Sequence, residues 1–103
     1  MKKSRSDYLL RRIYKLLRDE NVTLGLQKLK KPYVGIAFPW SKEMAIDPRC
    51  EVLSVVVHEC LHLLYEDARE RKILAMEKGI MNNMTVRQFI NLYMRIGCRL
   101  KGE

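Results

Sequence analysis

The two histidines of the chain lie four residues apart, in the run His58-Glu59-Cys60-Leu61-His62. On a helix, positions i and i+4 share one face, with Cβ atoms about 5–6 Å apart. That separation lets two imidazole nitrogens bind one zinc ion at about 2.0–2.1 Å. Glu59 is rotated by one residue, so its carboxylate would lie beside the metal and accept a proton from an attacking water. The spacing therefore predicts metal-assisted hydrolysis.

The helix expected to carry these residues, 48–65, is apolar on nearly every side, which is typical of a buried helix. Unpaired polar groups in such a helix would cost several kcal/mol. A metal ion bound to both imidazoles would remove that cost. The alternative is a chance match with hydrogen-bonded core histidines. A chance match would more often fall on an exposed helix of mixed polarity, so the metal site is favoured.

Zinc in a catalytic site needs a third protein ligand and an open position for water. The chain has no third histidine, but the helix expected over 68–81 carries Glu70 and Glu77. Glu77 lies on the apolar stripe between Ile73 and Ile80, so it should point towards the buried helix and is the favoured third ligand. Glu70 comes next, with the alternative role of complementing the helix dipole.

The elements that must position this site form a small α+β domain over residues 1–103. The first helix is expected to run from the capping residue Ser6 to about Asp19. Residues 21–31 are expected to be an irregular connection. Strands are expected over 33–38 and 43–46, joined as a hairpin.

Helix-start signals precede two of the helices. Asp47 is expected to cap the buried helix, with Pro48 at its first position. Thr85 and Gln88 have the spacing of a capping box and should open the last helix. Its inward face is expected to contain Val86, Phe89, Ile90, Tyr93, Ile96 and Leu100.

The histidine motif, with Ile46-Asp47-Pro48-Arg49 before it and a glutamate on the next helix, resembles the gluzincin zinc metallopeptidases. The small size is similar to that of the minigluzincins, which are soluble minimal members. The resemblance covers most of the chain from about Tyr33 and is specific over residues 46–77. It implies one zinc ion on His58, His62 and Glu77, with Glu59 as general base and acid.

The resemblance also implies that a peptide substrate binds along the strand before the active-site helix. Residues 43–46 are short and are expected to form a sheet edge, which suits strand addition. In the minimal family the C-terminal segment can block the site, so residues from about 85 to 103 are expected to hold the protein latent. Tyr65, Tyr93 or an arginine remain alternatives for stabilising the oxyanion.

The net charge of +8 is concentrated in residues 1–31, where ten basic residues face three acidic ones. A solvated helix face is the favoured explanation. The alternative function is a basic module that binds nucleic acid or an acidic protein and whose zinc site is structural or inactive. No apolar run is long enough for a membrane helix, and the three cysteines are too few for a disulfide framework. We therefore expect a cytoplasmic protein with reduced thiols.

Overall fold

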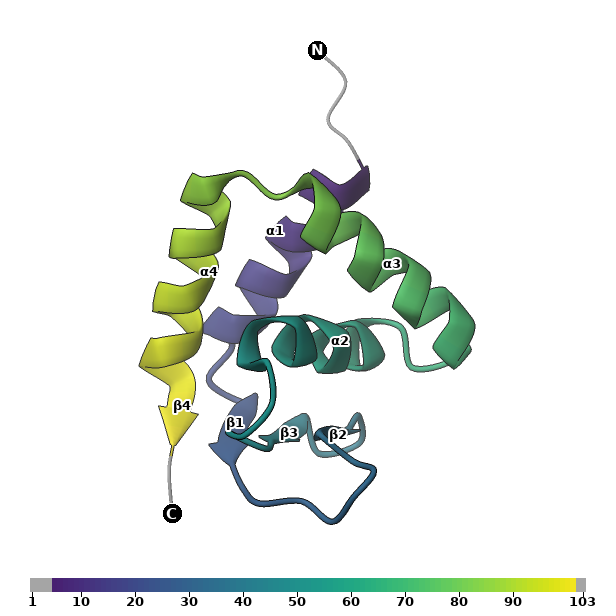
Figure 1. The fold of residues 1–103 in the computed structure, drawn as a ribbon, viewed down its shortest axis with the longest axis vertical. Helices are drawn as coiled ribbons and strands as arrows, with labels where there is room; N and C mark the ends of the chain where they lie inside the picture. The colour runs from purple at the N-terminus through teal and green to yellow at the C-terminus, as the bar shows by residue number, and fades with distance from the viewer. Residues whose placement is uncertain (1–4, 102–103) are drawn as a thin grey trace.

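The computed structural model describes residues 5–101 and shows a mixed α+β fold, as predicted (Figure 1). Helix α2 lies between the sheet and the other helices. The elements, in chain order, are α1 Arg5–Arg18, β1 Thr23–Leu26, β2 Gly35–Phe38, β3 Glu43–Ile46, α2 Val52–Leu64, α3 Glu70–Asn83, α4 Val86–Arg99 and β4 Leu100–Lys101.

Helix α2 is the centre of the core, which confirms the prediction of a buried helix. It packs against β2 and β3 on one side and against the other three helices elsewhere. Burying one Val or Leu side chain contributes about 1.5–3 kcal/mol. The core is therefore strongest around the helix that carries both histidines. The apolar residues of α2 that are almost inaccessible to solvent are Leu53, Val56, Val57, Cys60 and Leu61.

Asp47 does not cap α2, so that prediction is wrong. The helix begins at Val52, and residues 47–50 form a turn in which the Cys50 amide donates to the Asp47 carbonyl. The buried Asp47 carboxylate accepts hydrogen bonds from the backbone amides of Leu29 (3.0 Å) and Arg49 (2.9 Å). The Arg49 guanidinium lies 2.7 Å from Asp47 Oδ2. These bonds hold the loop before β2 against the start of α2.

The sheet has the order β2-β3-β1-β4. The predicted hairpin is present, because β2 and β3 pair antiparallel from Gly35 opposite Ile46 to Phe38 opposite Glu43. Strands β1 and β4 were not predicted, and each runs parallel to its neighbour. Strand β3 lies between β2 and β1, so the prediction that residues 43–46 form an edge is wrong. The edge beside α2 is β2.

Helix α1 is amphipathic, as predicted, and packs against α2, α3 and α4. Arg11, Lys15 and Arg18 are exposed on its outer face. Ser6 is not an N-cap but lies within the helix, where its hydroxyl donates to the Gly79 carbonyl of α3 at 3.1 Å. The buried residues of this helix are Leu9, Leu10, Ile13 and Leu17.

Helix α4 has the predicted capping box at Thr85 and Gln88. Its inward face is formed by Leu92 and Ile96. Three residues expected on that face, Val86, Ile90 and Tyr93, are instead exposed. The helix has two apolar stripes, one facing the core and one facing solvent. The prediction assigned residues of the solvent-facing stripe to the core.

No helix within residues 5–101 combines the length and the apolar character needed to cross a membrane.

Candidate metal centre

His58 and His62 project from the same face of α2, as their spacing predicts. Their Nε2 atoms lie 3.3 Å apart, and the ring centroids are 4.9 Å apart. Two nitrogens bound to one zinc at about 2.0–2.1 Å, with a tetrahedral angle between them, would lie about 3.3–3.4 Å apart. The separation of the two Nε2 atoms therefore fits a shared metal ion.

Glu70 completes the group from the first turn of α3. Its Oε1 lies 2.6 Å from Nε2 of His58, and its Oε2 lies 2.9 Å from Nε2 of His62. The ligand atoms of these three residues all lie within 4.8 Å of one another, close enough to hold a metal ion. The Glu70 side chain is 59% exposed, so the group is open to solvent on this side.

Glu77, the favoured third ligand in the sequence analysis, lies on the other nitrogen of His58. Its Oε1 is 2.6 Å from Nδ1. An ionised carboxylate can only accept hydrogen bonds, so Nδ1 donates to it. Metal-binding histidines commonly donate their second N–H to a carboxylate, which fixes the orientation of the ring. The structure therefore places Glu77 behind His58 and brings Glu70, the second choice, to the two Nε2 atoms.

The carboxylate oxygens of Glu70 and the unprotonated Nε2 atoms of His58 and His62 are all acceptors, so they can lie this close only if protons or a metal cation lie between them. Glu70 directs two carboxylate oxygens at the imidazole Nε2 atoms of His58 and His62. A proton or a metal cation must separate each oxygen from the nitrogen lone pair that it faces. Two imidazoles and one carboxylate form a ligand set found in catalytic zinc sites. The donor chemistry therefore fits a zinc ion.

Glu59 lies next to this group and lines the same cleft, although its side chain is only 7% exposed. Burial raises the pKa of its carboxyl to about 7, while the neighbouring His58 opposes that rise. The backbone of β2 covers it at Gly35. A Cβ atom built there would lie 3.0 Å from Glu59 Oε2 and 2.6 Å from Val55 Cγ1. A glycine is needed at this contact because the two elements approach so closely.

A cleft of about 380 Å³ opens above these residues. Its floor is α2, and its two walls are the segment 32–35 and helix α3. The apolar residues of these two walls were not predicted from the sequence. Leu74 could have been found, because it lies between Glu70 and Glu77 on the same side of a helix. Segment 32–35 had no comparable signal, because its place depends on how β2 packs on α2. The lining residues are Pro32, Tyr33, Val34, Gly35, Ser54, Val55, His58, Glu59, Glu70, Leu74 and Glu77.

The two tyrosines considered for the oxyanion lie outside this cleft. The Tyr65 hydroxyl accepts a hydrogen bond from Arg12 Nη1 at 2.9 Å, which ties the α2–α3 connection to α1. Tyr93 is exposed on α4. No residue of 85–101, the described part of the expected latency segment, lines the cleft. Gly102 and Glu103 lie outside the described residues.

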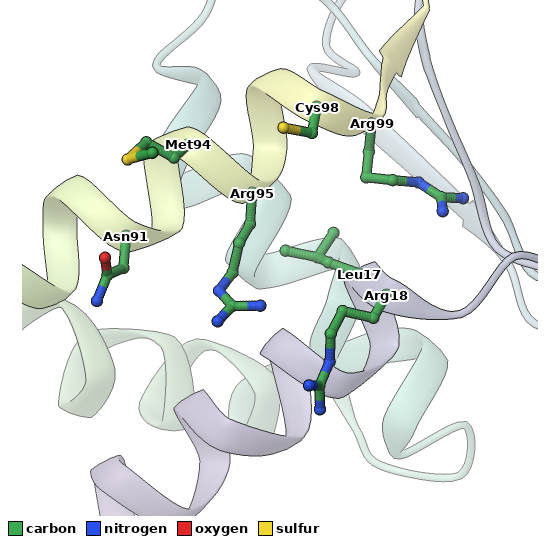
Figure 2. A pocket seen from close by; sticks show the side chains of 7 residues that line it. All are labelled: Leu17, Arg18, Asn91, Met94, Arg95, Cys98 and Arg99. Atoms are coloured by element: carbon green, nitrogen blue, oxygen red, sulfur yellow. The ribbon is translucent and has the colours of Figure 1, made fainter.

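A second cavity, of about 450 Å³, lies between α1 and α4 and shares no residue with the cleft (Figure 2). Three of its lining residues are arginines, and two of these have local partners. Arg95 lies over the Tyr14 ring, 4.4 Å from its centroid. Arg99 donates to the Val22 carbonyl. Arg18 lies in the last turn of α1, where a cation complements the helix dipole. These interactions give the arginines structural roles at the α1–α4 interface.

Comparisons with protein-family models, curated proteins and solved structures found no match for this chain.

Proposed function

We propose that the chain is a zinc-dependent metallopeptidase with His58, His62 and Glu70 as metal ligands. The observation that carries this proposal is the meeting of one carboxylate with two imidazole Nε2 atoms that are 3.3 Å apart. Glu77 supports this ligand set by accepting a hydrogen bond from Nδ1 of His58, which orients the ring. Three protein ligands leave a fourth position for water or substrate, which is the pattern of catalytic rather than structural zinc.

Each residue has a distinct role in peptide hydrolysis. A bound zinc ion supplies the Lewis acid that polarises the scissile carbonyl and acidifies water. Glu59 accepts the proton from the attacking water and later delivers it to the departing amine. The backbone of β2 at Gly35 packs closely against the Glu59 carboxylate and limits its movement. Glu77 keeps the His58 ring in the tautomer that presents the Nε2 lone pair.

The substrate approaches along β2 in this proposal, in place of the strand expected from the sequence. Within residues 5–101, β2 pairs only with β3, so its other edge is available for strand addition. The segment just before β2 forms one wall of the cleft that contains His58 and Glu59. A peptide added to this edge would pass over the metal ligands.

The decisive experiment separates metal binding from turnover. Glu59→Gln should keep bound zinc, because Glu59 is not a ligand, and should lose peptide hydrolysis by at least about 10²-fold, because it lacks the base. His58→Ala should lose both. Zinc is measured by elemental analysis and hydrolysis with a quenched fluorescent peptide mixture.

Two outcomes would contradict the proposal. Wild-type protein that remains free of zinc after incubation with the metal would remove its basis. A zinc-bound wild type with no hydrolysis, together with salt-sensitive retention of Glu59→Gln on nucleic acid, would favour the basic binding module instead.

A further inference from the structure

Building on the proposed function, we infer that the cleft selects peptides with a large, uncharged apolar side chain next to the scissile bond. Leu74 on one wall and the pair Tyr33–Val34 on the other are the residues that would contact it.

These three residues expose much of their side chains at one place. Leu74 is 51% exposed, Tyr33 60% and Val34 47%. Single exposed apolar residues are common and need no explanation. These three, however, line the same cleft as His58 and Glu59. A side chain that enters the cleft would cover the part of their area that faces it, and covering apolar area is favourable at about 25 cal/mol per Å².

Leu74 lies close to the reacting centre because of helical spacing. It follows Glu70 by four residues and precedes Glu77 by three, so all three lie on one side of α3. Glu70 and Glu77 both contact His58. A substrate carbonyl held at the ligand group would therefore have its neighbouring side chain beside Leu74.

The charge of the cleft excludes acidic side chains. Three glutamates, Glu59, Glu70 and Glu77, line it, and its lining contains no lysine or arginine. The chain as a whole carries a net charge of +8, so its cations are concentrated elsewhere. An acidic substrate side chain between Leu74 and Tyr33 would lose its hydration without gaining a cationic partner.

Amino acid hydroxamates can test this inference on the zinc-loaded protein without any turnover. The hydroxamate group binds zinc, and only the side chain differs among the glycine, leucine and aspartate derivatives. The leucine compound should bind about tenfold or more tightly than the glycine compound, since apolar pockets discriminate at this level. The aspartate compound should be the weakest of the three.

Substitutions at Leu74 test whether the α3 wall of the cleft causes the preference for the leucine compound. Leu74→Ala should reduce the leucine-to-glycine preference several-fold while leaving the affinity for the glycine hydroxamate and for zinc unchanged. Leu74→Lys should raise the affinity for the aspartate compound above that for the leucine compound. Ile90→Ala is the matched control, because Ile90 is 54% exposed on α4 and does not line the cleft. It should leave the preference unchanged.

The outcomes distinguish this inference from the proposed function. Equal binding of the leucine and glycine hydroxamates by zinc-loaded protein, or an unchanged preference in Leu74→Ala, would overturn the apolar selection while leaving the metallopeptidase proposal standing. Failure of the wild type to bind zinc would overturn both.

Discussion

Gly35 and Glu59 meet where β2 crosses α2, and the contact leaves no room for another carbon atom. A Cβ on Gly35 would lie 3.0 Å from the Glu59 carboxylate oxygen and 2.6 Å from Val55 Cγ1. The position of the proposed general base is therefore set by the backbone of a strand in addition to its own helix.

We expect Gly35→Ala to displace Glu59 and lower the turnover number for peptide hydrolysis by at least about tenfold, because a misplaced base transfers protons poorly. Overpacking should also cost about 1–3 kcal/mol of unfolding free energy. Zinc affinity should change little, since the three atoms nearest to such a Cβ belong to Val55 and Glu59 and not to the proposed ligands. Kinetics and chelator competition on the same preparation would measure both effects.

Gly97→Ala is the control, because a Cβ at Gly97 meets nothing within 4 Å. Alanine in a helix interior should stabilise the protein by about 0.5–1 kcal/mol and leave hydrolysis unchanged. If Gly35→Ala hydrolysed peptides as fast as wild type, the close contact between Gly35 and Glu59 would not be what positions the base.

Replacing Glu70 and Glu77 separately should distinguish a metal ligand from the residue that orients one. Loss of the carboxylate behind a ligating histidine typically lowers metal affinity about 10–100-fold. Glu77→Ala should fall in that range, whereas Glu70→Ala removes a ligand and should weaken zinc binding further. Competition with a chromophoric chelator gives both affinities. A greater loss of affinity in Glu77→Ala would restore the ligand favoured from sequence.

Asp47 should make the fold sensitive to acid. Hydrogen bonds from Arg49 and Leu29 hold the pKa of the Asp47 carboxyl well below its usual range. A carboxyl whose pKa is depressed by folding stabilises the native state above its unfolded pKa of about 3.9, and this contribution is lost as the pH falls towards the folded pKa. We expect Asp47→Asn to unfold more readily than wild type at pH 7, and the difference to shrink below about pH 4.

Urea unfolding of both proteins at a series of pH values would show this convergence. Asp19→Asn is a useful comparison, because the pKa of Asp19 is also lowered but its carboxylate contacts an exposed turn and Lys42. A constant difference between wild type and Asp47→Asn across the acid range would contradict the assignment.

Removal of residues 86–103 should destabilise the domain rather than activate it. Leu92 and Ile96 are almost fully buried in the core. Removing each side chain would lower the free energy of unfolding by about 1.5–3 kcal/mol. Circular dichroism should show the loss of a cooperative thermal transition. A folded, zinc-binding product with increased hydrolysis would instead support the latency expected from the family resemblance.

The central part of the site could be predicted because it depends on local helical geometry. The spacing of His58 and His62, and the apolar helix around them, required no knowledge of tertiary structure. The choice between Glu70 and Glu77 did require it. These two residues lie on nearly the same side of α3, and which one reaches the two Nε2 atoms depends on how α3 crosses α2. Glu70 is nearer the connection between the helices, so it lies opposite His62.

The parts of the fold that could not be predicted depend on distant partners. Strand β1 is four residues long with a single buried side chain, Leu24, so it has no clear alternating pattern. Its partners, β3 and β4, are far away in sequence. Helix α4 carries apolar residues on two sides, and only packing against the core distinguishes Leu92 from Ile90.

The parallel pairing of Leu24 with Leu100 has a consequence for how the protein is made. At a synthesis rate of about 5–20 residues per second, Leu100 is added roughly 4–15 s after Leu24. During that interval β1 lacks one neighbour, and α2 is complete before the α4 residues that cover it have been added. Helix α2 therefore spends its first seconds after synthesis with part of its apolar surface uncovered, where chaperones can bind it before the fold is complete.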